Sequence, residues 1–149
     1  MKFILINIWF LLFSLDFVNP SSDAFDFGLL GPDAYNVIID SCKKDLEINK
    51  EARNQIMAQC IYPTIRASSI NFPHDFIETL QRIEVDCWDR RGDFCNQSER
   101  IRANHCAIPV LSSKGFRYHL FWQSNKYPIR AAFSEKKECI AEAIEEAND

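Results

Sequence analysis

The sequence predicts an all-α fold, a compact disulfide-linked bundle of five or six short helices in one domain. Apolar residues recur at helical spacing in successive segments of the chain. Six cysteines are available to join these segments, and all of them follow residue 24. Gly is scarce, with 4 residues in the chain, and neither sustained strand-like alternation nor the Asn-Gly turns of β-hairpins are present.

Residues 1–24 have the pattern of a signal peptide. A short basic start precedes an unbroken apolar run over residues 3–13. This run is too short for a membrane-spanning helix, which needs about 20 apolar residues. The best small-residue cleavage pattern ends at Ala24, with Ser22 as second choice. We therefore expect a secreted, extracellular protein with a single mature domain over residues 25–149 and no later membrane span.

The charge balance disfavours two classes of partner. The whole chain has 17 Lys and Arg against 21 Asp and Glu, a net charge of −4. Loss of Lys2, Asp16 and Asp23 with the leader leaves 16 − 19 = −3. Such a mildly acidic protein is not expected to bind nucleic acid or an anionic membrane.

The cysteines predict three disulfides, because an even number in an exported chain favours full pairing. Their pairing cannot be derived from spacing. The closest two are separated by seven residues, whereas zinc sites use pairs such as C-x2-C, so neither a metal nor another cofactor is expected. The disulfide-forming residues are expected to be Cys42, Cys60, Cys87, Cys95, Cys106 and Cys139.

Two helices are predicted first along the mature chain. Asp33 is expected to cap the first, whose apolar stripe continues to Leu46. Asn49 is expected to cap the second. Pro63 lacks a backbone donor and should kink or end this helix near Tyr62.

A third helix is expected to have Pro73 in its first turn and to end at Gly92. Its apolar stripe contains one polar residue, Glu84. The pattern Asn96–Glu99 resembles a capping box and predicts a fourth helix that ends at Pro109. The side chains expected to face inward from this helix are Ile101, His105 and Ile108.

Two helices complete the predicted bundle. Residues 116–122 alternate like a strand but also fit a buried helix, and we favour the helix. Ser134 is expected to cap the last helix, which has charges on its outer face. Its inward stripe contains Cys139, Ile140, Ala143, Ile144 and Ala147.

Aromatic residues are more numerous than a few short helices need. Helical domains place ligand sites between helices and line them with apolar and aromatic groups. The third and fifth helices could therefore hold a small hydrophobic molecule. The alternative is that these side chains fill the core, since aromatic residues bury large areas. The candidate ligand-binding residues are Phe76, Leu80, Phe116, Tyr118, Phe121 and Trp122.

The triplet Arg91-Gly92-Asp93 lies between Cys87 and Cys95 and resembles the integrin-recognition loop of disintegrins. The resemblance implies that Arg91 reaches an acidic pocket and that Asp93 coordinates the integrin's metal ion. The other interpretation makes Gly92 a helix terminator and Arg91 a partner of the helix dipole. A disulfide between Cys87 and Cys95 would favour the first interpretation.

Other motifs predict a modification and exclude a recognisable active site. Asn96-Gln97-Ser98 is a glycosylation sequon, and a glycan on Asn96 would crowd the neighbouring Arg-Gly-Asp triplet. The three His residues are dispersed, and no nucleophile, base and orienting group can be named together. We therefore do not expect an enzyme.

In outline, the predicted architecture is similar to the insect odorant- and pheromone-binding proteins, which are exported helical carriers with three disulfides around an apolar pocket. The chain lacks that family's pair of cysteines separated by three residues. The leading hypothesis is an extracellular carrier of a small hydrophobic ligand. The alternative is a secreted ligand or effector of a cell-surface receptor, such as an integrin antagonist acting through Arg91-Gly92-Asp93.

Overall fold

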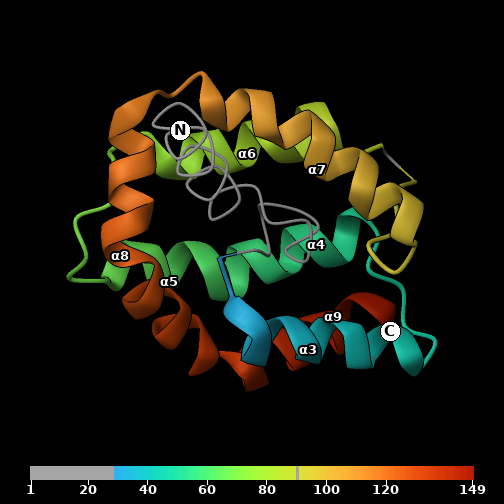
Figure 1. Cartoon of the computed structure of the whole chain (residues 1–149). Helices are drawn as coiled ribbons and strands as arrows, with labels where there is room; N and C mark the ends of the chain where they lie inside the picture. The colour runs from blue at the N-terminus through green and yellow to red at the C-terminus, as the bar shows by residue number, and fades with distance from the viewer. Residues whose placement is uncertain (1–28, 90) are drawn as a thin grey trace, which may run out of the picture.

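The computed structural model describes residues 29–89 and 91–149, and within these residues it contains six helical segments and no strand (Figure 1). The predicted all-α fold is confirmed. The expected signal peptide, residues 1–24, lies outside the described residues. No helix in the described part of the chain has the length and apolar character that a membrane crossing requires.

Helix α3 (Gly31–Lys43) begins two residues before the expected cap. Asp33 lies in its first turn and makes no capping hydrogen bond, so that prediction was wrong. Gly31 adopts a φ of 73° and packs against the stem of Arg130, where a Cβ would come within 3.0 Å of that side chain. Pro32 then fixes the first helical turn. Leu46 lies beyond the helix end.

The second helical segment is continuous but changes its winding. It consists of α4 (Lys50–Ile56), the π-helical turn η2 (Met57–Ile61) and α5 (Tyr62–Ala67). Asn49 caps α4 as predicted, accepting a hydrogen bond from the Ala52 N–H at 3.1 Å. Pro63 does not end the segment. The wider π-helical turn η2 precedes it, so that Pro63 lies in the first turn of α5, where a residue needs no N–H donor for the helix.

Helix α6 (Phe76–Cys87) is shorter than expected at both ends. Pro73 precedes it and accepts a hydrogen bond from the Phe76 N–H at 3.0 Å. The helix ends before Gly92 because Trp88 adopts an extended backbone, with φ −107° and ψ 129°, and its side chain is buried. Gly92 instead closes a separate turn, donating its N–H to the Asp89 carbonyl at 2.9 Å.

Helix α7 (Gln97–Ser112) begins at the predicted cap, Asn96. It continues through Pro109, where it was predicted to end. The residues on its inward face also differ from those predicted. Ile101 is 44 % exposed, His105 is exposed and Ile108 is only partly buried. The buried side chains are instead small or aliphatic and allow close packing against α6: Ala103, Ala107 and Leu111.

Helix α8 (Phe116–Ser134) confirms the helical interpretation of residues 116–122. Ser134 is the last residue of α8 and does not cap the next helix, α9 (Lys137–Asn148). Its hydroxyl donates to Asp33 Oδ2 at 3.3 Å and so joins α8 to the start of α3. The expected inward stripe of α9 is confirmed, with Ile140, Ala143 and Ile144 buried and its cysteine and last alanine partly buried.

The helices form two groups that α8 joins (Figure 1). Helix α9 packs against α3, α4 and η2, whereas α6 packs against α7. In the figure α8 runs from the α6–α7 group toward α3, which it contacts. One large apolar core contains residues from all of these helices, and a second, smaller core of Ile83, Ala107 and Leu111 lies between α6 and α7.

The three predicted disulfides are confirmed, and each joins distant parts of the chain. Cys60–Cys139 joins η2 to α9, and Cys87–Cys106 joins α6 to α7. Cys42–Cys95 joins α3 to the segment that precedes α7. This third bond therefore links the two helical groups covalently.

Candidate functional site

Four aromatic rings meet between α6 and α8, and we call Phe72, Phe76, Tyr118 and Phe121 the aromatic cluster. Ring centroids lie 5.0 Å apart for Phe72 and Phe76 and 5.2 Å apart for Phe72 and Phe121. Phe76 lies 5.8 Å from Phe121 and 6.1 Å from Tyr118. Phe76 and Tyr118 are buried, whereas Phe72 and Phe121 are only partly buried. The cluster therefore extends from the core toward the surface.

The other predicted ligand-binding residues lie in different surroundings. Leu80 and Trp122 are buried in the same apolar core. Phe116 is 66 % exposed, and its ring stacks on His119 with centroids 6.2 Å apart. Phe72 belongs to the aromatic residues that the sequence offered for a cavity, but it was not among the six predicted ligand-binding residues.

A hydrogen-bond network fixes the inner end of the aromatic cluster. The Tyr118 hydroxyl donates to Asp75 Oδ1, and Lys114 Nζ donates to Asp75 Oδ2 at 2.9 Å. The Tyr118 hydroxyl also lies 3.2 Å from Thr79 Oγ1. The Tyr118 bond and then the Lys114 bond lower the pKa of Asp75 to about 2. Burial, followed by the bond to Asp75, raises the pKa of Tyr118 to about 12.

The Arg-Gly-Asp triplet does not form a disulfide-closed loop, because Cys87 and Cys95 belong to different disulfides. Arg91 is exposed and Gly92 is buried. Asp93 Oδ1 accepts hydrogen bonds from the Ile48 N–H at 3.0 Å and from the Cys95 N–H at 2.9 Å. The carboxylate that would bind an integrin's metal ion thus stabilises the backbone of this protein.

Beneath the triplet lies a buried arginine that sequence reasoning missed. Arg53 is 0 % exposed, and its Nε donates to Glu84 Oε2 at 3.2 Å. Its Nη1 donates to the carbonyls of Ile48, at 3.2 Å, and of Gly92. Its guanidinium carbon lies 4.1 Å from the centroid of the Trp88 ring. The only signal in the sequence was Glu84, the polar residue within the apolar stripe of α6.

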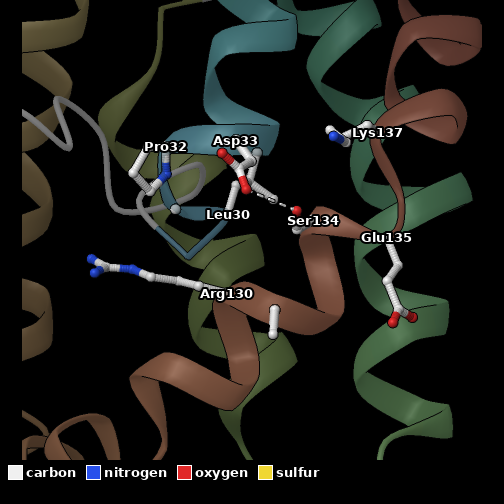
Figure 2. Close-up of a pocket in the computed structure, with 9 residues that line it drawn as sticks. Leu30, Pro32, Asp33, Arg130, Ser134, Glu135 and Lys137 are labelled. Atoms are coloured by element: carbon white, nitrogen blue, oxygen red, sulfur yellow. Dashed lines mark hydrogen bonds between the residues drawn. The ribbon is translucent and has the colours of Figure 1, made fainter.

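Two pockets lie away from the aromatic cluster. One, of about 380 Å³, is lined by residues from the start of α3, the end of α8 and the start of α9, including Asp33, Ser134 and Lys137. Figure 2 shows the Asp33–Ser134 hydrogen bond there and the Arg130 side chain extending away from it. The other, of about 710 Å³, includes Arg91 and Asp93 in its polar lining. Neither pocket is lined by the residues predicted to bind an apolar ligand.

The predicted glycosylation site, Asn96, is exposed at the start of α7. Its side-chain Oδ1 accepts hydrogen bonds from the N–H groups of Ser98, at 3.0 Å, and Glu99, at 3.3 Å. Nδ2, the atom that would carry a glycan, is not part of these capping bonds. Glycosylation of Asn96 stays a prediction.

Within residues 29–89 and 91–149, no group of three or more His, Cys, Asp and Glu side chains is placed to hold a metal ion. No protein-family model matches the chain, and no curated protein or solved structure matches it either. The chain's own geometry is therefore the basis for a functional hypothesis.

Proposed function

We propose that this protein is an extracellular binding protein that carries a small hydrophobic molecule at the aromatic cluster between α6 and α8. The main support for this proposal is that the partly exposed rings of Phe72 and Phe121 lie directly against the buried ring of Phe76. A ligand inserted there would exchange water for aromatic contacts, worth about 25 cal/mol for each Å² of apolar surface buried. Three disulfides fit an oxidising, extracellular environment.

Uptake requires the rings to separate, because they pack against one another in the structure. Phe72 lies in the segment between α5 and α6, outside both helices. It can therefore move without breaking an intrahelical hydrogen bond. Tyr118 is held by Asp75 and Thr79 and provides a fixed inner wall.

The receptor-ligand alternative has less support from the Arg-Gly-Asp triplet. Asp93 Oδ1 accepts hydrogen bonds from the backbone of Ile48 and Cys95, and the carbonyl of the buried Gly92 accepts one from Arg53. These bonds hold the triplet against the rest of the protein, and no disulfide closes it into a projecting loop.

A fluorescent apolar probe tests the carrier proposal. The oxidised protein should bind the probe saturably, and hydrophobic competitors should displace it. Phe121→Ala should weaken probe binding by removing a cluster ring. Phe116→Ala is the matched control, because it removes the same ring from an exposed position on the same helix, and it should leave binding unchanged. Absence of saturable binding, or equal losses in the two variants, would contradict the proposal.

A further inference from the structure

The buried Arg53 site contains three polar atoms whose hydrogen-bonding capacity is unused. They are Arg53 Nη2, Glu84 Oε1 and Trp88 Nε1, and each is buried without a hydrogen-bond partner in the described part of the chain. Their side chains contact one another through the Arg53–Glu84 ion pair and the stacking of Arg53 on Trp88. We call these three residues the polar trio.

The unused atoms have a specific chemistry, because two are N–H donors and one is a carboxylate acceptor. A buried polar atom without a hydrogen-bond partner has lost its contact with water and gained nothing in exchange, so an occupant that satisfies all three atoms is favoured. A hydroxyl can accept two hydrogen bonds and donate one, which matches the trio. A carboxylate can accept from Arg53 and Trp88, but its charge would repel Glu84.

Glu84 of the polar trio and Phe76 of the aromatic cluster lie on the same side of α6. Phe76, Leu80 and Glu84 follow one another at four-residue intervals, which places them along one side of the helix. The distance from Phe76 to Glu84 along the helix axis is about 12 Å, from a rise of 1.5 Å per residue. Glu84 and Trp88 are 9 % and 7 % exposed, so this end of the core lies just beneath the surface.

We propose that the carried ligand is an alcohol whose apolar body contacts the aromatic cluster and whose hydroxyl binds the polar trio. This inference rests on the carrier function proposed above and specifies the chemical class of the ligand. The hydroxyl accepts from Arg53 Nη2 and Trp88 Nε1 and donates to Glu84 Oε1. Leu80, which lies between the two sites on α6, contacts the middle of the ligand.

Competition between decanol and decanoic acid tests this assignment. At pH 7 the acid is a carboxylate, while the two apolar chains are matched. Decanol should displace the fluorescent probe at a concentration at least about five-fold lower, the effect of one hydrogen bond of about 1 kcal/mol. Equal displacement by the two compounds, or preference for the acid, would overturn the alcohol assignment and leave the carrier proposal standing.

Trp88→Phe removes the indole donor but keeps an aromatic ring over Arg53. It should reduce the preference for decanol over decanoic acid. Trp122→Phe makes the same change at another buried position, outside the polar trio. Because Trp122 is a predicted ligand-binding residue, its substitution can lower the affinity for both compounds, but it should leave the ratio of their affinities unchanged. Thermal unfolding and circular dichroism establish that both variants are folded. A preference that survives Trp88→Phe, or that Trp122→Phe reduces equally, contradicts the assignment.

A direct NMR measurement separates this inference from the carrier proposal. Decanol should shift the indole N–H resonance of Trp88, identified by its loss in Trp88→Phe, downfield and in a saturable way. If the probe binds but this resonance does not move, only the polar trio assignment fails. If neither probe nor decanol binds, the carrier proposal fails, and the inference fails with it.

Discussion

The two ends of α6 each place a carboxylate opposite a cation, but in contrasting surroundings. At the start of the helix Asp75 is 24 % exposed, and both of its oxygens accept hydrogen bonds, from Tyr118 and Lys114. Near the end the side chain of Glu84 is 8 % exposed, and only Oε2 has a partner, the fully buried Arg53. Water can replace a lost partner at the exposed end, whereas it has limited access to the buried end. A pair of opposite charges should therefore contribute differently to the free energy of unfolding at the two ends of α6.

The largest effect is expected from Arg53→Met. The substitution leaves Glu84 as a buried charge without its cation and removes the donor to the carbonyls of Ile48 and Gly92. We expect a loss of about 3 to 5 kcal/mol in the free energy of unfolding, measured by urea denaturation with the disulfides intact.

The double variant Arg53→Met with Glu84→Leu is the control for this prediction. It removes both charges together, so it should be more stable than Arg53→Met alone. A loss below about 1 kcal/mol in the single variant would show that Glu84 is solvated there, and the contrast between the two ends of α6 would disappear.

Tyr118→Phe should have an intermediate effect. It removes the hydroxyl that donates to Asp75 and leaves the ring in the aromatic cluster. A hydrogen bond to a charged group contributes about 1.5 to 3 kcal/mol, and we expect a loss in this range, with Asp75 still bound by Lys114. Carboxyl carbon NMR should show the pKa of Asp75 rising from about 2 toward 3.8. An unchanged Asp75 titration would contradict the assigned cause.

The same network predicts how stability depends on pH. The pKa of Asp75 is lower in the folded protein than its ordinary 3.8, so its contribution is present above pH 3.8 and is lost as the pH falls through about 2. The pKa of Tyr118 is raised from 10.0 to about 12, so its contribution is present below pH 10 and is lost as the pH rises through 12. In Tyr118→Phe the dependence at high pH should disappear, because phenylalanine does not titrate, and the dependence at low pH should become weaker. Urea denaturation across the pH range measures both.

The smallest effect is expected from Lys114→Ala. Both members of the Lys114–Asp75 pair are 24 % exposed, and partly solvated pairs contribute at most about 1 kcal/mol. Added salt should reduce the difference from the unmodified protein, because exposed charges are screened. A loss as large as that of Arg53→Met would show that exposure does not distinguish the two ends of α6.

Local sequence signals predicted which segments are helical better than they predicted where each helix ends and which of its sides is buried. Asn49 and Asn96 were recognisable as helix caps because each side chain accepts a hydrogen bond from an N–H group only three residues further along the chain. Prolines were interpreted too strictly, since a π-helical turn accommodates Pro63 and α7 continues through Pro109. The end of α6 could not be predicted, because the buried position of Trp88 depends on contact with Arg53, 35 residues earlier in the chain.

The candidate site was predicted in part. The sequence indicated the aromatic residues of α6 and α8, and four aromatic side chains do meet between these helices. It could not indicate that Phe116 points to solvent, because the orientation of α8 is set by its packing against other helices. Arg53 was missed because an arginine on a short helix ordinarily lies at the surface.

The sequence by itself determined the helical class and two caps, because helical periodicity and capping act over a few neighbouring residues. The even cysteine count also indicated three disulfides. Tertiary structure alone decided which cysteines pair and which charges are buried. Cys60 and Cys139 are 79 residues apart, and Arg53 and Glu84 are 31 apart. Such pairs meet only when whole helices pack, and that packing depends on the shapes of many side chains together rather than on any local pattern.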